Sequence, residues 1–270
     1  MLKSEEYLRQ FDLALRCKYD SQATIKNYYS CVKKFFRYSE GKQLPIEELI
    51  KNYLVWGAGS KEPKTINLHR SAIICFFKLV KGIKIKTDSV PRRKEKKQLP
   101  KIVPLEKIGE AINKTTNIKH KIELMLFFDC GIRLCEIAGL KVKNVLSNGK
   151  VLWLQDTKGN KERIIPVSES VSKLLVCYID GKEKEEYVFG GVCKRTFSKV
   201  VTTAFGRVGV KATPHQLRHS FATYQIASGE SPFKVQSWLG HSNIKTTQTY
   251  VHLSNQLLSE KKDLLQIKII

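Results

Sequence analysis

The chain has 270 residues, which is enough for two modest domains or for one large domain. Its 48 lysines and arginines outnumber its 25 acidic residues, and a net charge of +23 favours a polyanionic partner: nucleic acid first, an anionic membrane surface second. A run of about 18 apolar residues is missing, so no membrane span is expected, and the acidic, amphipathic N-terminus is unlike a signal peptide.

Positive charge is spread along the whole chain. Residues 1–100 hold 22 basic and 10 acidic residues, and residues 101–270 hold 26 and 15. This suits a protein that grips a long ligand from two sides, although a solubilising surface would also explain it. The seven cysteines form no C-x-x-C pair and lie in apolar segments, so we expect reduced core residues of a cytosolic protein.

Four amphipathic helices are predicted in residues 1–83. Apolar side chains recur at helical spacing from Tyr7 to Leu15, and Ser21 is placed to cap a second helix. Pro45 suits the first turn of a third helix, and PKTINLHRSAIICFFKLVK predicts a fourth. Short connections between these helices indicate a small helical bundle.

Residues 84–100 differ in composition from both neighbours. They hold seven lysines and arginines, two acids, two prolines and few apolar side chains. We expect a linker between domains rather than a core element. A plain tether is the simpler interpretation, but the surplus charge also lets Arg92, Arg93 and Lys94 lie along phosphates.

Residues 101–270 are predicted to form a second, mainly helical domain. Helices are expected over VPLEKIGEAINK, IKHKIELMLFFDC and RLCEIAGL, with Gly131 at a helix end. Between residues 150 and 167 the apolar period changes to that of a strand, which predicts a β-hairpin with its turn in TKGNKER. The predicted fold class is therefore mainly α with a small β-hairpin or sheet (α+β).

The segment TPHQLRHSFAT predicts a helix that starts with a capping threonine and a proline. His215 and Arg218 share one face near its start, where the helix dipole favours anions, and Leu217 lies on another face that packs. His215 and His219 have zinc-like spacing, but Arg218 would repel a cation, so no metal is expected. A structural role is the simpler interpretation of either histidine alone.

Two more segments hold candidate residues. In GIRLCEIAGL, a surface ion pair would explain Arg133 and Glu136, but the apolar surroundings favour an arginine held in place and oriented by Glu136. The hairpin tip holds Lys158 and Lys161. An exposed, solvated turn is the simpler interpretation of that tip, although a mobile tip can deliver a lysine to a ligand.

The stretch SPFKVQSWLGHSNIKTTQTY brings His241 and Tyr250 close in sequence. A short helix ends at Gly240, His241 follows, and the next helix carries Tyr250, so both can reach one pocket. Arginines and histidines stabilise charge on a phosphate, a tyrosine is a nucleophile, and a lysine can protonate a leaving oxygen. A buried aromatic ring would explain the tyrosine alone, whereas phosphoryl transfer without a metal explains the whole set.

In this order, CGIRLCEIAGL, TKGNKERIIPV, TPHQLRHSFAT and WLGHSNIKTTQTY resemble the motifs of tyrosine recombinases of the phage integrase family, close to the compact Xer type. The resemblance covers nearly the whole chain. It implies a helical core-binding (SAM-like) DNA-binding domain at 1–83, a basic linker at 84–100 and a catalytic domain at 101–270. Together these would form a C-shaped clamp on DNA. Cys130 and Thr157 depart from residues common in the family, but neither has an expected catalytic role.

The resemblance also implies the site residues. Tyr250 attacks the scissile phosphate and forms a 3′-phosphotyrosyl link, and Lys158 protonates the leaving 5′ oxygen. Arg133, Arg218 and His241 bind the phosphate, and His215 accepts a proton or orients the others. Glu136 supports these residues, and His219 is expected to lie behind the reacting groups. The residues expected to contact DNA are Arg92, Arg93, Lys94 and Lys161.

The family further implies a homo-tetramer on paired sites in double-stranded DNA, with no cofactor, no metal and no membrane. A second recombinase or an accessory factor is a further partner to consider, and the expected location is cytoplasmic, with the nucleoid. Two alternatives stay open: an enzyme like type IB topoisomerases, and a non-catalytic DNA-binding protein on the same scaffold.

Overall fold

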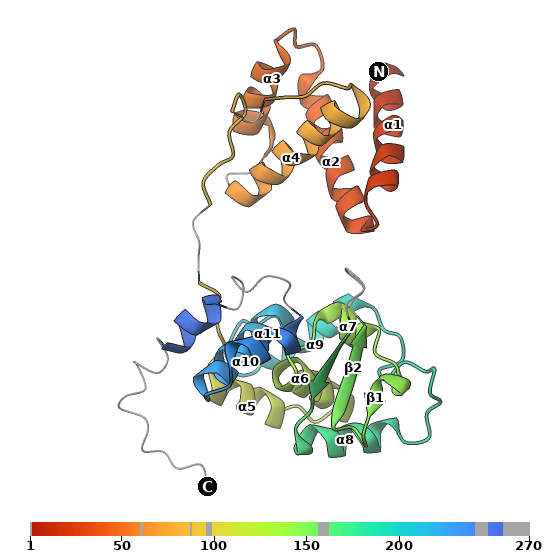
Figure 1. The fold of residues 1–270 in the computed structure, drawn as a ribbon, viewed down its shortest axis with the longest axis vertical. Helices are drawn as coiled ribbons and strands as arrows, with labels where there is room; N and C mark the ends of the chain where they lie inside the picture. Colours follow the sequence, from red (N-terminus) through yellow and green to blue (C-terminus); the bar gives the residue numbers. More distant parts are fainter. Residues whose placement is uncertain are drawn as a thin grey trace. The chain divides into compact units, whose positions relative to one another are not determined.

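A computed structural model describes residues 2–59, 62–86, 88–95, 99–155, 162–240 and 248–255 of the chain. The chain divides into two compact units, Met1–Lys97 and Gln98–Ile270, and each is considered by itself (Figure 1). Both units are mainly helical and the second contains a small sheet, so the predicted α+β fold class is confirmed. Within the described ranges, no helix has the length and hydropathy needed to cross a bilayer.

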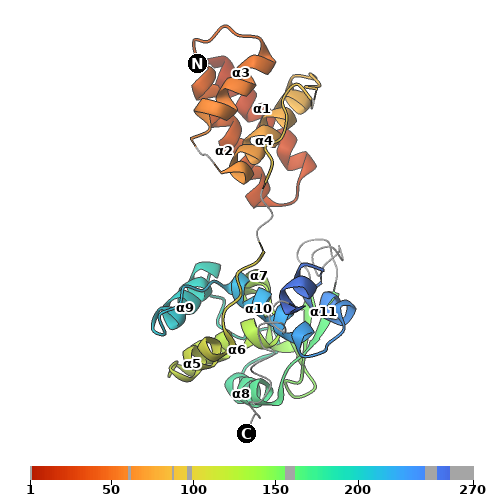
Figure 2. The same ribbon diagram turned by 90° about the vertical axis from the view of Figure 1, so that its left-hand side faces the viewer.

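The first unit is a bundle of four helices and one π-helical turn. The four helices pack around aromatic rings that meet edge to face, with Phe76 against Phe11 and Phe36. The elements, seen from two sides in Figures 1 and 2, are α1 (Leu2–Lys18), α2 (Gln22–Ser39), α3 (Ile46–Asn52), the π-helical turn (Tyr53–Gly57) and α4 (Pro63–Val80).

The helix starts of this unit follow their local sequence. The Ser21 side chain accepts a hydrogen bond from the Thr24 amide, as a capping residue does. Pro63 occupies the first turn of α4. Pro45 lies one position earlier than predicted, because its extended backbone makes it the capping residue and α3 begins at Ile46.

The basic segment after α4 is attached to the first unit. Ile85 and Val90 are 6% and 1% exposed and belong to its core, so the expectation of a linker without core residues is wrong for this part. The Asn67 side chain of α4 bonds both the amide of Arg93, at 2.9 Å, and its carbonyl, at 3.0 Å. Arg70 donates to the Val90 carbonyl.

Residues 88–95 are called the strap below. The strap's backbone is held by α4, yet the side chains of Arg92, Arg93 and Lys94 are exposed to solvent. Arg92 approaches Glu95 at 3.9 Å and keeps 66% of its side chain exposed. The strap therefore displays cations from a fixed backbone.

In the second unit, α6 lies at the centre, and α5, α8, α9 and α10 pack against it (Figure 2). Its long apolar face explains this position, since Ile122, Leu126 and Phe127 are fully buried. The helices of the unit are α5 (Leu105–Asn113), α6 (Ile118–Asp129), α7 (Leu134–Ala138), α8 (Glu169–Ile179), α9 (Lys194–Gly206), α10 (Pro214–Ala227) and α11 (Pro232–Leu239).

The sheet of this unit has the order β1-β2-β3 and is antiparallel. The predicted hairpin is present as β2 (Val151–Gln155) and β3 (Glu162–Pro166), with Leu154 opposite Arg163. The third strand, β1 (Val145–Leu146), follows a 3-10 turn (Val142–Asn144) and was not predicted, because two residues are too few to show a strand period.

The cysteines are all free thiols. Cys31, Cys75 and Cys130 are buried in the cores of the two units, as expected. Cys17, Cys177 and Cys193 are exposed, so the expectation of core residues is wrong for these three.

Candidate active site

Helix α10 supplies most of the candidate side chains. Thr213 caps it by accepting from the Gln216 amide, and Pro214 occupies its first turn, as predicted. Leu217 and Phe221 are buried on one face. His215 and Arg218 line an open pocket of ≈ 390 Å³ on another face, together with Arg133, and so share a face as predicted.

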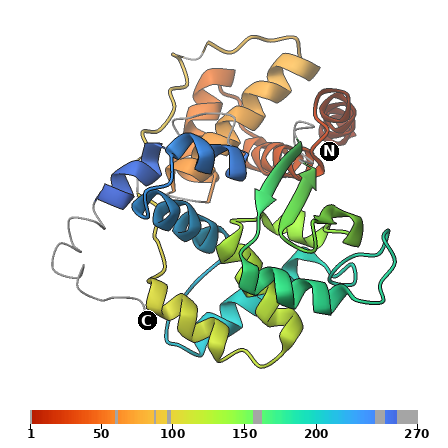
Figure 3. The ribbon, with the colours of Figure 1, turned by 60° about the horizontal axis from the view of Figure 1, so that its bottom comes forward.

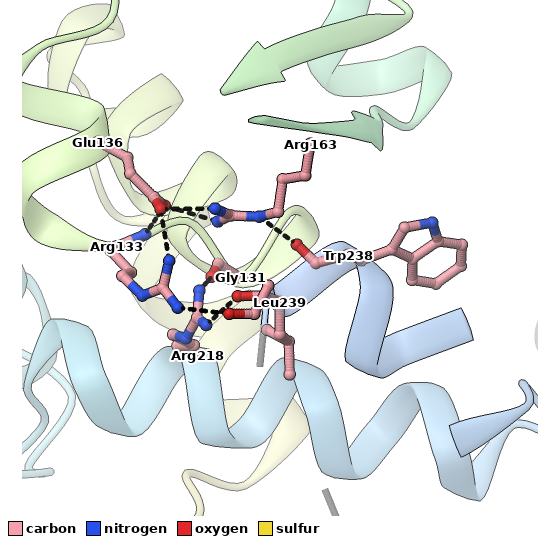
Figure 4. Close-up of polar contacts among 8 residues, drawn as sticks. Gly131, Arg133, Glu136, Arg163, Arg218, Trp238 and Leu239 are labelled. Atoms are coloured by element: carbon pink, nitrogen blue, oxygen red, sulfur yellow. Dashed lines mark hydrogen bonds and ion pairs between the residues drawn. The ribbon is translucent and has the colours of Figure 1, made fainter. Parts of the chain in front are cut away.

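Arg218 is held rigidly at the floor of this pocket. It is 3% exposed, and it donates to the carbonyls of Gly131 and Leu239 at 2.6 Å each (Figure 4). Burial lowers its pKa to about 10, and the charge of Arg133 adds to this effect while Glu136 opposes it. The guanidinium therefore stays charged at neutral pH, with its plane fixed before any ligand arrives.

Arg133 lies at the start of α7 and is oriented by Glu136, as predicted. Its backbone amide and its Nη1 donate to the two Glu136 oxygens at 2.7 and 2.8 Å, and its Nη2 donates to the Gly240 carbonyl at 3.0 Å. Its side chain is 30% exposed, whereas that of Glu136 is 2% exposed. The buried Glu136 carboxylate thus anchors Arg133, whose side chain lines the pocket.

The sequence analysis missed Arg163 of β3. Its Nη1 and Nη2 donate to the two Glu136 oxygens at 2.7 Å each, and its Nε donates to the Trp238 carbonyl at 2.6 Å (Figure 4). Burial raises the pKa of Glu136, but the bonds and charge of Arg163, and then those of Arg133, outweigh burial and lower that pKa. The signal was available, because the strand period places Arg163 on the buried face beside Ile165.

Two glycines allow this arrangement. Gly131 has φ +55°, and a Cβ there would lie 2.4 Å from the Phe221 ring. Gly240 ends α11 with φ +63°, and a Cβ there would lie 3.1 Å from the Arg163 side chain. Because both carbonyls accept from the pocket arginines, a larger residue at either position would displace those arginines.

Tyr250 lies beside α10, in the helical residues 248–255 that are deep blue in Figure 3. It is 2% exposed, packs with Phe221 and Leu239, and places its hydroxyl 2.8 Å from Nδ1 of His219. Burial raises its pKa, and Arg218 partly opposes that rise. The phenol is therefore protonated at neutral pH.

Of the two histidines of α10, His215 lines the pocket with Arg133 and Arg218, while His219 is the one next to Tyr250. His219 was predicted to support from behind, but it contacts the Tyr250 hydroxyl directly, while His215 packs on the His219 ring at 4.2 Å between centroids. Burial, then His215 and Arg218, lower the pKa of His219 to about 4. Burial, then Arg218 and Arg133, lower that of His215. Both rings are neutral at pH 7 and can accept a proton.

Three predicted site residues, Lys158, Lys161 and His241, lie outside the described residues. The structure brings Arg133, Arg218 and His215 together around one pocket, with His219 and Tyr250 adjoining. The strap cations belong to the first unit, away from this group in the chain. The arrangement offers two fixed guanidiniums, two neutral imidazoles and one phenol. Such a set can bind an anionic group, such as a phosphate, and supply an oxygen nucleophile that attacks it.

Comparison with known proteins identifies similar sequences. The model of the "Phage integrase family" matches residues 95–256. Tyrosine recombinase XerA of Pyrococcus horikoshii is 27% identical over 266 residues, which cover 95% of this chain and 92% of the relative. Tyrosine recombinase XerC of Lactobacillus leichmannii is 30% identical over 233 residues, which cover 77% of this chain and 78% of the relative.

Solved structures share the fold. A XerH site-specific recombinase in a post-cleavage complex with a difH substrate has a TM-score of 0.72 and 18% identity, covering 90% of this chain and 80% of that one. A lambda integrase dimer bound to a core site has a TM-score of 0.73 and 16% identity, covering 91% and 94%. The fold of the chain is therefore that of DNA-bound recombinases.

Proposed function

This chain belongs to the phage integrase family, and we propose that it is a tyrosine-type site-specific recombinase that cuts and rejoins double-stranded DNA. One observation carries the proposal. The Tyr250 hydroxyl adjoins α10, and this same helix holds Arg218 in a pocket shared with Arg133 and His215. These are the groups that transfer of a phosphoryl group to tyrosine requires.

In the proposed reaction the Tyr250 oxygen attacks the phosphorus of one DNA strand. A bond from phosphorus to the tyrosine oxygen forms, and the bond to the 5′ oxygen breaks. The phenol proton passes to the neutral imidazole of His215, which lines the pocket, and Lys158 protonates the leaving 5′ oxygen. Attack by the 5′-hydroxyl of a partner strand reverses these steps, so phosphodiester bonds are conserved and no cofactor is needed.

The two arginines stabilise the charge that develops on the phosphate. Arg218 is locked by the Gly131 and Leu239 carbonyls, and Arg133 is locked by Glu136, so neither has to reorganise during the reaction. His241 joins them in the role that the family implies.

The reaction also requires Tyr250 to move. A hydroxyl on a residue that is 2% exposed cannot meet a DNA phosphate where it lies. We expect the helical residues 248–255 to shift so that the ring leaves His219 and enters the pocket. Until then, burial keeps the phenol protonated and unreactive.

DNA is the expected partner of both units, with the strap cations and Lys161 on phosphates. A lambda integrase tetramer bound to a Holliday junction resembles this chain in fold, with a TM-score of 0.71 at 17% identity, and this supports a homo-tetramer on paired sites. We expect the protein to act in DNA integration and excision or in the resolution of chromosome or plasmid dimers, in the cytoplasm, alone or with a second recombinase or accessory factor.

Covalent capture tests the proposal. The protein is incubated with host genomic fragments in EDTA and denatured, and the attached DNA is sequenced while the linked peptide is mapped by mass spectrometry. We expect DNA on the Tyr250 peptide at one recurrent sequence. Tyr250→Phe should bind DNA without forming the adduct. Tyr224→Phe, which alters a tyrosine of α10 whose hydroxyl donates to the Val103 carbonyl, should retain the adduct.

The other outcomes point elsewhere. Adducts scattered over many sequences would indicate an activity like that of type IB topoisomerases. DNA binding without any adduct, also when a host extract supplies the second recombinase or accessory factor, would indicate a non-catalytic binding protein. An adduct that persists in Tyr250→Phe would refute the assignment of the nucleophile.

A further inference from the structure

Arg163 is a buried cation that the proposed reaction leaves without a role. Its side chain is 6% exposed, and it does not line the pocket that holds Arg133 and Arg218. All three of its nitrogen atoms donate at 2.6–2.7 Å, two to Glu136 and one to the Trp238 carbonyl. Because these bonds connect Arg163 to Glu136 and to the end of α11, its role is not limited to packing in the core.

The first consequence concerns charge. Each Glu136 oxygen accepts one bond from Arg163 and one from Arg133, so a single carboxylate is shared between two guanidiniums. The three side chains together carry one net positive charge, and Arg133 is the guanidinium of the two that reaches the pocket. Without Arg163, Glu136 would neutralise Arg133 alone, and that positive charge would be lost from the phosphate site.

The second consequence concerns the end of α11. Three consecutive carbonyls, at Trp238, Leu239 and Gly240, accept from three different arginines: Arg163, Arg218 and Arg133 in that order (Figure 4). The last carbonyls of a helix lack partners within it and carry the negative end of its dipole, so cations stabilise them. The turn fixed in this way directly precedes His241 in the sequence.

We propose that Arg163 is a positioning residue: it shares Glu136 so that Arg133 keeps its positive charge for the scissile phosphate, and it fixes the turn before His241. The idea rests on the proposed recombinase function for its phosphate, but the pocket's affinity for an anion can be measured without DNA. A role confined to folding predicts no dependence on charge, which separates the two explanations.

The test compares Arg163→Met, Arg163→Lys, Glu136→Gln and the double variant Glu136→Gln with Arg163→Met in the full chain. Inorganic vanadate is titrated into each folded protein and followed through the NMR signals of the His215 imidazole. The rate of adduct formation is measured in parallel on the DNA fragment recovered by covalent capture. Circular dichroism confirms folding at the temperature used.

Arg163→Met should weaken vanadate binding and slow adduct formation at least tenfold, because the pocket loses one net charge. Arg163→Lys restores the charge and should recover most of the vanadate affinity, but less of the rate, because a lysine cannot make the three bonds. The double variant removes one charge of each sign, so its vanadate affinity should return to within about threefold of the wild type.

The inference is overturned if folded Arg163→Met binds vanadate like the wild type, or if the double variant binds no better than Arg163→Met. Should Arg163→Met fail to fold, the same decision falls to the double variant, because a tenfold loss of vanadate affinity there, relative to the wild type, would refute the charge argument. Absence of any adduct from the wild type would refute the recombinase proposal instead, while the vanadate titration would still decide the role of Arg163.

Discussion

The two units use buried polar side chains in opposite ways. In the first, Asn67 and Arg70 are buried and hold the backbone of the strap, while the strap's own cations face solvent. In the second, the guanidiniums of Arg163 and Arg218 are themselves buried. Arg163 bonds the Glu136 carboxylate, whereas Arg218 lines the pocket.

This difference predicts that DNA affinity and the rate of strand cleavage depend on different units. Exposed cations are screened by salt, and their contributions to binding a polyanion add together, so the strap should govern how tightly DNA binds. Buried and oriented guanidiniums are screened little and act at one point, so the pocket should govern how fast the strand is cut.

The largest expected effect is on the chemistry, from Arg218→Lys. A lysine keeps the charge but cannot donate to the Gly131 and Leu239 carbonyls in the same plane, so we expect adduct formation to slow by roughly 10²–10³-fold. DNA affinity should change less than about threefold. Arg207→Lys, an exposed position on the same unit, is the control and should alter neither quantity.

A parallel fall of affinity and rate in Arg218→Lys would break the distinction between the units, since it would mean that the pocket also governs binding. Single-turnover rates at saturating DNA, measured together with equilibrium binding, make that comparison directly.

The next effect is on affinity, from replacing Arg92, Arg93 and Lys94 together with alanine. We expect DNA to bind roughly 10–100-fold more weakly at 0.1 M salt, and the slope of log affinity against log salt to fall by up to about 3. The rate at saturating DNA should stay within about threefold of the wild type. Binding isotherms over a range of salt concentrations measure the slope.

A matched control removes three exposed lysines of the second unit, Lys143, Lys150 and Lys173, which lie near the sheet and α8. Both variants lose three positive charges. An equal loss of DNA affinity in the two would therefore show that the total charge of the protein, and not the strap, determines that affinity.

Features of these regions could be predicted from the sequence where the interacting residues lie close together in the chain. Helix starts at Ser21 and Thr213 were predictable, since the cap and its partner lie three residues apart. The pairing of Arg133 with Glu136 was predictable for the same reason. The hairpin was predictable from its period of two, and Leu152 and Leu154, two residues apart on β2, are both buried.

Contacts across long stretches of chain were not predictable. Arg163 meets the Trp238 carbonyl 75 residues away, and nothing in the local pattern names that acceptor. Asn67 meets Arg93 26 residues away, which turned an expected linker into a fixed strap. His219 and Tyr250 meet because 248–255 packs on α10, and the spacing of His215 and Arg218 pointed instead to the other histidine.

Asn67→Ala is a milder way to sharpen the comparison. It removes the two bonds to Arg93 and a third bond to the Glu95 side chain without removing any charge, so the strap cations remain while their backbone loses this support. We expect the Arg93 amide to lose protection from hydrogen exchange and DNA to bind about threefold to tenfold more weakly, because the strap must be ordered on binding. Ser71→Ala, one turn along α4, is the control.

Unchanged DNA affinity together with loss of Arg93 protection would mean that the strap does not need a fixed backbone. Unchanged protection would mean that the Asn67 bonds do not hold the strap in solution. The first result would refute the link between a fixed strap and DNA affinity, and the second would remove the structural basis for treating the strap as a preformed part of the first unit.

The smallest effect on the reaction is expected at Glu123, a buried charge of the second unit that has no part in the pocket. It is 1% exposed, and within the described residues neither of its oxygens has a hydrogen-bond partner. Burial raises its pKa to about 7, against the opposing charge of Lys119 one turn earlier on α6. The pKa of Tyr178 of α8 is raised by burial and, to a smaller extent, by the charge of Glu123.

Since the folded pKa of Glu123 lies above its unfolded value, the stability it allows is complete at low pH and is lost as pH rises through about 7. Glu123→Gln should therefore raise the free energy of unfolding by about 2 kcal/mol at pH 8, and by little at pH 5. Thermal melts at both pH values measure this, with adduct formation unchanged. Glu110→Gln is the matched control, because lysine bonds lower that pKa to about 2 and the variant should gain nothing at pH 8. An equal gain for Glu123→Gln at both pH values would show that packing, not charge, limits this site, whereas the predicted dependence would leave the pocket as the place where the second unit's buried charges are needed.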